Sequence, residues 1–153
     1  MLVFAQKCNT KYDGINLELA LFLDESSLAK YPQDEFMEDL DIVINSTGTG
    51  TLGRVGIYRS ADNPINARVV PDSHVTVIRA SHQLNAMYLY TFLKAMQPQL
   101  EKHGEGSTNQ KELKANTIKE LYIPLPPISE QQRITNTIDT LLSAIEKIEK
   151  SLS

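Results

Sequence analysis

A short proline-rich segment near the C-terminus limits the possible folds of this chain more than any other feature. Pro124, Pro126 and Pro127 lie close together, and each proline fixes its own φ and disfavours helix in the residue before it. No helix can run through this segment, so the chain is divided there. Ser129 with Gln132 three residues later matches a capping box, which predicts that a new helix begins at Ser129.

The residues after the prolines predict one long amphipathic helix. Its apolar side chains recur at alternating spacings of four and three, which is the spacing of a coiled-coil seam. A helix over residues 129–153 would be about 37 Å long at about 1.5 Å per residue. We expect a projecting dimerisation helix whose seam is formed by Ile134, Ile138, Leu141, Ile145, Ile148 and Leu152. The alternative is that this stripe packs on the chain's own globular part.

The preceding residues predict an α+β domain that is rich in strands. Apolar runs and alternation predict strands over residues 17–23, 42–45, 54–58, 67–70 and 75–79, although residues 17–23 could also begin a helix. Helical spacing then predicts a helix over residues 85–97 that packs on the sheet and ends before Pro98. We therefore expect a strand-rich domain with packed helices over residues 1–127 and a projecting coiled-coil helix over residues 128–153.

Between this helix and the prolines the pattern changes again. Ser107 or Thr108 is a candidate N-cap for a short helix, and Glu112 would lie near the start of that helix, where its dipole favours acidic residues. Residues 122–123 then read as a strand. The buried positions expected here are Leu113, Ile118 and Leu121.

Composition excludes several classes of protein. The chain has 153 residues, of which 41% are hydrophobic and 22% charged, as expected for one globular domain with an arm. No apolar run approaches the roughly 20 residues that cross a bilayer, and there is no secretory signal, so we expect a cytoplasmic protein without membrane contact. Cys8 is the single cysteine, and the three histidines do not cluster, so we expect neither a metal nor a cofactor.

Charge is unevenly distributed along the chain. The formal net charge is −4, yet residues 46–119 carry nine Lys or Arg against five Asp or Glu. The flanking segments are acidic. A basic surface between acidic ones could face DNA phosphates while the remainder is repelled, which would orient the molecule on a duplex.

A glycine-rich turn follows the predicted strand 42–45. Residues 46–53 are small and carry hydroxyls, but they lead into another strand and lack the Gly-Lys-Ser/Thr ending of a nucleotide-binding loop. Such a loop can approach a DNA backbone or base edge closely. A plain connecting hairpin is the alternative interpretation.

Several of these motifs together resemble the specificity subunits of type I restriction-modification systems. The resemblance is carried by residues 41–44 (DIVI) with 47–50 (TGTG), and by 104–113 (GEGSTNQKEL), 118–121 (IKEL), 123–127 (IPLPP) and 129–134 (SEQQRI). It implies one target-recognition domain plus a conserved spacer helix, corresponding to half of a two-domain subunit. The implied partners are double-stranded DNA, methyltransferase subunits, endonuclease or motor subunits, and a second half-subunit or second copy joined through the terminal helix.

On this reading the chain recognises DNA and does not catalyse a reaction. Phosphate or guanine contacts are expected from Arg54, Arg59, Arg68, Arg79, Lys102 and Lys111. Contacts to base edges or backbone oxygens are expected from Thr47, Thr49, Ser73, His74, Asn109 and Gln110.

Two other functions remain as alternatives. One is a coiled-coil adaptor without a nucleic-acid role, which would show no salt-dependent DNA binding. The other is a Mg²⁺-dependent nuclease built on Asp72, Glu112 and Lys114, although these residues are widely spaced. A DNA-adenine methyltransferase is excluded because Asn63-Pro64-Ile65-Asn66 lacks the second proline and the aromatic ring of the base-holding motif.

Overall fold

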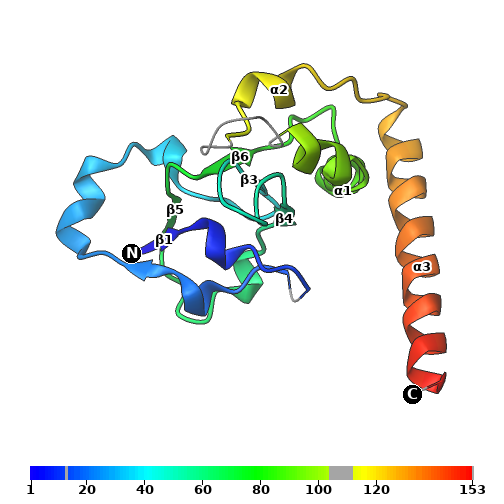
Figure 1. Cartoon of the computed structure of the whole chain (residues 1–153), viewed down its shortest axis with the longest axis horizontal. Helices are drawn as coiled ribbons and strands as arrows, with labels where there is room; N and C mark the ends of the chain where they lie inside the picture. The colour runs from blue at the N-terminus through cyan, green and yellow to red at the C-terminus, as the bar shows by residue number, and fades with distance from the viewer. Residues whose placement is uncertain (13, 104–111, 153) are drawn as a thin grey trace.

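Two small three-stranded sheets and a long terminal helix organise the chain (Figure 1). The computed structural model describes residues 1–12, 14–103 and 112–152. The first sheet has the order β2-β1-β5, with β1 (Leu2–Phe4) antiparallel to β2 (Leu21–Phe22) and parallel to β5 (Val69–Pro71). The second has the order β4-β3-β6, and β3 (Ile42–Asn45) is antiparallel to both β4 (Val55–Ile57) and β6 (Val75–Ile78).

Strand β3 lies at the centre of the molecule and is covered on both faces. Successive side chains of a strand point to opposite sides. Val43 accordingly packs with Leu2, Phe4 and other residues around the first sheet, whereas Ile42 and Ile44 pack with residues of helix α1 (Ala86–His103). The continuous apolar run is thus that of a strand buried on both sides.

Helix α1 also closes the open edge of the second sheet at β4. The Lys94 ammonium donates to the carbonyl of Val55 (3.0 Å), and the N–H of Val55 donates to Oε1 of Gln97 (3.1 Å). Burial lowers the pKa of the Lys94 ammonium. These contacts fix the helix against the strand and satisfy backbone groups that an edge strand would otherwise expose.

The remaining elements are short, apart from the terminal helix. Helix α2 (Ala115–Lys119) precedes the proline segment, and α3 (Ile128–Leu152) follows it. Short 3₁₀-helices connect the strands: η1 (Gln6–Cys8), η2 (Leu17–Leu19), η3 (Glu25–Lys30), η4 (Gln33–Glu35) and η5 (Ser60–Asp62). The α+β class and the long terminal helix are confirmed. Among the described helices, none is both long enough and apolar enough to cross a membrane.

Helix α1 does not end before Pro98, as the sequence predicted, but continues to His103. Pro98 has no N–H to donate to the carbonyl of Lys94, a loss that normally breaks a helix. The next turn is held in place because Leu100 is fully buried in the core around β3. Tertiary packing therefore overrides the local preference of the proline.

Other local predictions were also wrong. Residues 17–23 form η2 and the two-residue strand β2. Glu112 pairs with Thr47 in an isolated bridge, so helix α2 starts only at Ala115, and residues 122–123 form no strand. The caps at Ser107 and Thr108 lie outside the described residues. Helix α3 begins at Ile128, and the N–H groups of Glu130 and Gln131 donate to the carbonyl of Pro127, so Ser129 lies inside the first turn.

Candidate nucleic-acid interface

The register of the second sheet separates the predicted DNA-contacting residues into two groups. Ile42 is opposite Ile57 and Ile78 at one end of β3, whereas Asn45 is opposite Val75 at the other. At the Asn45 end, β3 finishes and β4 and β6 begin. The predicted contacts in the loops there are Thr47, Thr49, Arg54, Ser73 and His74, and we call this the loop end. Arg59 and Arg79 lie at the Ile42 end, and Arg68 is linked to them through Phe36, whose ring it covers and whose carbonyl accepts from Arg79; we call this the arginine end.

Three separate segments meet at the loop end. The N–H of Ser46 donates to the carbonyl of His74 (2.9 Å), and the N–H of Leu113 donates to the carbonyl of Ser46 (2.8 Å). Thr47 Oγ1 lies 3.0 Å from His74 Nδ1. The β3–β4 loop, the β5–β6 turn and the chain at residue 112 therefore form one surface, on which Thr49, Ser73 and His74 are exposed.

A buried polar network, which was not predicted from the sequence, holds the β3–β4 loop. Asn9 Nδ2 donates to Asn45 Oδ1 (3.2 Å) and to the carbonyl of Arg54 (3.0 Å), while Asn45 Nδ2 donates to the carbonyl of Gln6 (3.1 Å). Asn9 and Asn45 are almost completely buried. An asparagine at the end of an apolar run was the one signal of a buried polar contact. Satisfied networks of this kind fix one arrangement of a loop.

Arg54 belongs to this network and holds the loop through hydrogen bonds to two backbone carbonyls. Its Nη1 donates to the carbonyl of Asn9 (2.8 Å) and its Nη2 to the carbonyl of Gly50 (3.0 Å). The side chain thus joins the loop to the segment after η1. The predicted phosphate contact stays a prediction, but the geometry gives Arg54 a structural role as well.

Lys102 lies near the same surface through the packing of the loop on α1. A Cβ added to Gly53 would come within 2.6 Å of the backbone nitrogen of Glu101, so the loop touches the helix backbone directly. Lys102 is the next residue and is exposed. Lys7, on η1, and Lys114, after Leu113, are exposed cations on elements that contact the loop end. Neither was predicted from the sequence as a DNA contact, and Lys114 was considered only for the nuclease alternative.

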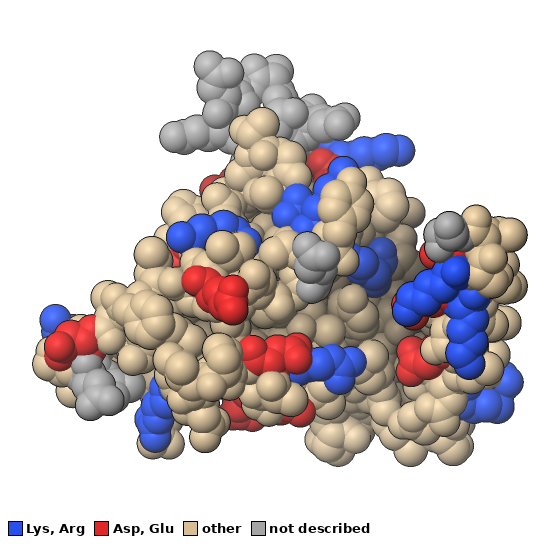
Figure 2. Space-filling model, turned by 90° about the horizontal axis from the view of Figure 1, so that it is seen from below, with Lys and Arg blue, Asp and Glu red and all other residues tan. Residues whose placement is uncertain are grey.

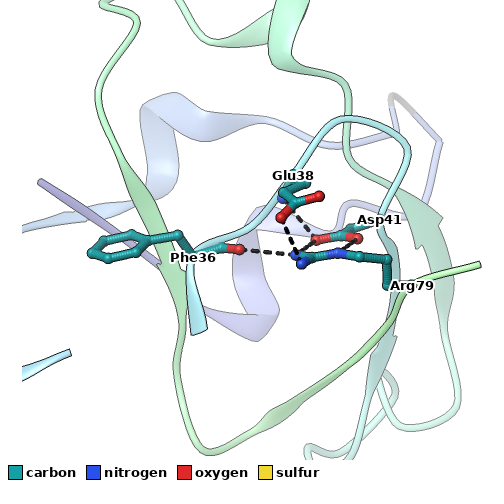
Figure 3. A network of polar contacts seen from close by, with 4 residues as sticks. All are labelled: Phe36, Glu38, Asp41 and Arg79. Carbon is teal, nitrogen blue, oxygen red and sulfur yellow. Dashed lines mark hydrogen bonds and ion pairs between the residues drawn. The ribbon is translucent and has the colours of Figure 1, made fainter. Parts of the chain in front are cut away.

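Arg79, at the arginine end, is fully engaged in an ion-pair network (Figure 3). Its Nε and Nη2 donate to the two carboxylate oxygens of Asp41 (2.9 and 2.8 Å), and Nη1 donates to Glu38 Oε1 (2.7 Å). Nη2 also donates to the carbonyl of Phe36 (2.9 Å). The Asp41 carboxylate is 1% exposed, and hydrogen bonding to it raises the pKa of Arg79. This arrangement favours a structural role for Arg79 over a phosphate contact.

The other two arginines at this end are exposed in acidic surroundings. Arg68 stacks over the ring of Phe36 at 4.8 Å, and Arg59 Nη2 lies 3.7 Å from the sulfur of Met87. Asp39 accepts the N–H and hydroxyl of Ser60 (2.7 and 2.9 Å), and these hydrogen bonds lower the pKa of its carboxyl. A carboxylate held ionised near these arginines reduces their attraction for phosphate.

Charges of both signs are interspersed over the face seen in Figure 2, and basic side chains also occur on the terminal helix. Asn109, Gln110 and Lys111 lie outside the described residues.

Within residues 1–12, 14–103 and 112–152, no three His, Cys, Asp or Glu side chains form a group that could hold a metal ion. The carboxylate of Asp72 accepts the N–H of His74 (2.9 Å), which fixes the β5–β6 turn.

Along α3 the predicted seam changes from partly covered to exposed. Ile134 and Ile138 are partly buried near the start of the helix. Leu141, Ile145, Ile148 and Leu152 are each more than half exposed. Figure 1 shows α3 passing α1 and extending beyond it. The distal half of the seam is therefore available to a partner.

Comparison with known proteins agrees with this architecture. The family model for the type I restriction modification DNA specificity domain matches residues 6–152. The chain belongs to this family.

Relatives of this specificity-domain family include larger proteins. The type I restriction enzyme EcoBI specificity subunit of Escherichia coli is 29% identical over 120 residues, which cover 74% of this chain and 23% of that protein. Among solved structures, a chain of a type I restriction-modification system, from a study of complex assembly and conformational transition, has a TM-score of 0.71 at 15% identity. The match covers 99% of this chain and 33% of that chain.

The HsdS subunit of Thermoanaerobacter tengcongensis has a TM-score of 0.60 at 18% identity, covering 77% of this chain and 26% of that one. At such identities these structures establish the shared fold. The present chain spans between about a quarter and a third of the length of these relatives.

Proposed function

We propose that the chain recognises a DNA sequence as one half of a type I specificity subunit, and that the loop end is its DNA-contacting surface. The observation that carries the proposal is the meeting of three segments at that end, in a chain whose family is defined by DNA specificity. Loops supported by a rigid scaffold are where binding residues concentrate.

The chemistry of the loop end suits a duplex. Thr49, Ser73 and His74 offer exposed hydroxyl and imidazole groups that can reach base edges or backbone oxygens. Lys7, Lys102 and Lys114 add positive charge on neighbouring elements, as phosphate contacts require. Asn109, Gln110 and Lys111 stay predicted contacts. At the arginine end, acidic neighbours make a phosphate-binding surface less favourable.

The proposal assigns different roles to the two parts of the chain. Residues 1–127, which we call the head, would read DNA, and residues 128–153 would form the spacer and dimerisation helix. The exposed half of the seam supports pairing with a second copy or a second half-subunit. Methyltransferase and endonuclease subunits, working in the cytoplasm, would supply the chemistry, so the chain itself would be non-catalytic.

Salt dependence of DNA binding, measured with the methyltransferase partner present, tests this proposal. A random duplex library would first be used to select a target, and affinity for that target would then be measured against salt. Replacing Lys7 and Lys102 together by Gln should reduce the slope of log K against log salt by about 2, if each contacts one phosphate. Replacing Arg59 and Arg68 by Gln is the matched control and should leave the slope unchanged.

Either of two outcomes would contradict the proposal. If the assembly enriches no sequence and binds no duplex, DNA recognition is excluded and the adaptor alternative gains support. If the control pair lowers the slope and the lysine pair does not, the DNA-contacting surface is at the arginine end.

A further inference from the structure

A buried glutamine joins the terminal helix to the head. Gln131, in the first turn of α3, has no exposed surface. Its Oε1 accepts the N–H of Asn85 (2.8 Å), and its Nε2 donates to the carbonyls of Gln83 (3.2 Å) and Pro126 (2.9 Å). One side chain thus connects three backbone groups, two of them immediately before α1.

Two further contacts surround this junction. Asn85 caps α1 by accepting the N–H of Tyr88 (3.0 Å), and its Nδ2 donates to Gln132 Oε1 (2.9 Å). The hydroxyl of Tyr88 donates to the carbonyl of Pro124 in the proline segment (3.0 Å). The starts of both helices and the proline segment before α3 are therefore held by directed hydrogen bonds, which fix angles more tightly than apolar contact does.

We propose that Gln131 is a positioning residue that sets the direction in which α3 leaves the head, and thereby the separation of the two DNA half-sites. The second clause rests on the proposed function. Leverage makes small angular errors matter: a rotation of about 5° at the junction moves the far end of a roughly 37 Å helix by about 3 Å. That displacement is close to the rise of one base pair, about 3.4 Å.

The apolar contacts along α3 would not fix this direction by themselves. Ile134 and Ile138 are only partly buried, and the helix beyond them is exposed. Among the described residues of α3 the two fully buried positions are polar, Gln131 and Thr135. The Thr135 hydroxyl donates to the carbonyl of Gln132 within the same helix (2.9 Å), so this hydrogen bond does not join α3 to the head. This contrast supplies a matched control.

Distance measurement between two spin labels tests the first clause without DNA. Labels would be placed at Ala61→Cys in the head and Lys147→Cys on the distal helix, in a full-length Cys8→Ala background, and diluted with unlabelled protein to suppress signals between copies. The unmodified junction should give one narrow distance distribution. Gln131→Leu removes the side-chain partner of three part-buried backbone groups, so water must replace it, and the distribution should become at least about two-fold broader.

Thr135→Val, equally buried but without a bond to the head, should keep the narrow distribution. Tyr88→Phe keeps the ring and removes the bond to Pro124, so it should broaden the distribution less than Gln131→Leu does. If Gln131→Leu does not fold, the distribution of Tyr88→Phe is compared with that of the parent protein instead. A mere loss of stability would lower the yield of folded protein without changing these distances. Distributions that stay unchanged in every folded variant would overturn the inference.

Selection from a library of split sites with varied spacers tests the second clause. The parent assembly should prefer one spacer length, whereas Gln131→Leu should spread that preference over neighbouring lengths and leave the half-site sequence unchanged. An unchanged spacer preference together with broadened distances would overturn the second clause alone. If the parent assembly selects no DNA at all, the proposed function fails, while the spin-label distances still decide the role of Gln131.

Discussion

Arg79 and Asp41 form an ion pair in which one partner is almost completely enclosed. Replacing Arg79 by Met would leave the buried Asp41 carboxylate without its guanidinium, and we expect a loss of about 2–3 kcal/mol in the free energy of unfolding. The value is below that for a fully buried pair because Arg79 is partly exposed. Chemical denaturation would measure it. Arg59→Met removes an exposed arginine at the same end and should change stability by no more than about 0.5 kcal/mol.

Cys8 is a second residue whose environment predicts its chemistry. The side chain is fully buried, and burial raises the pKa of its thiol. The folded state therefore keeps the proton more strongly than the unfolded chain does. This contribution to stability is present below the unfolded pKa of about 8.5 and is lost as pH rises above it. Between about pH 8 and 10, the melting temperature should fall more for the parent protein than for Cys8→Ala. Equal losses would contradict this assignment.

The contacts that each arginine side chain makes were hard to predict from the sequence. Arg54 and Arg79 were predicted as phosphate or guanine contacts at the ends of strands, but nothing in the sequence showed that their donors are directed to Asn9, Gly50 and Asp41. The contacts with Asn9 and Asp41 join positions that are 45 and 38 residues apart. Sequence periodicity describes neighbours along one element and carries no information about these pairings.

At the scale of elements, the glycine-rich loop offers a matched pair of substitutions. Gly50 and Gly53 both have φ near +75°, but a Cβ at Gly50 meets nothing within 4 Å, whereas one at Gly53 would meet the backbone of Leu100 and Glu101 at 2.7 and 2.6 Å. We expect Gly50→Ala to cost about 1 kcal/mol from backbone strain alone. Gly53→Ala should cost about 2–4 kcal/mol, because the loop must also move off α1. Thermal unfolding compares the two, and equal losses would show that the loop does not pack on α1.

Elements with strong patterns were predictable, and those fixed by tertiary contacts were not. The strands over residues 42–45 and 75–78 and the terminal helix follow from apolar runs and heptad spacing. Pro98 and residues 112–114 adopt structures that their local sequence disfavours or leaves open, because Leu100 and Leu113 are buried against β3 and its loop. Burial of a few large side chains outweighs local propensities of about 1 kcal/mol.

In the whole molecule, the loop end lies at one end of the second sheet, and helix α3 is fixed to the head near the other end. The start of α3 contacts the residues before α1, and Arg59 at the arginine end contacts Met87 in the first turn of α1. The loop end lies across β3 from this junction. A DNA-reading surface and a spacing element on different sides of one head would allow two copies to engage neighbouring stretches of one duplex without obstructing each other.

The exposed half of the seam predicts the assembly state of the whole molecule. Ile145 lies at its centre, about half exposed, between Leu141 and Ile148. If two copies pair through this stripe, Ile145→Glu places a charge in the apolar interface and should raise the dimer dissociation constant at least about 100-fold, which corresponds to roughly 3 kcal/mol. Sedimentation equilibrium over a range of concentrations measures that constant. Lys147→Glu also introduces a negative charge, but outside the seam, and should leave the constant within about three-fold of the parent. A parent protein that stays monomeric at high concentration would contradict pairing between copies and favour a second half-subunit as the partner of this stripe, since so much exposed leucine and isoleucine is disfavoured on a free helix.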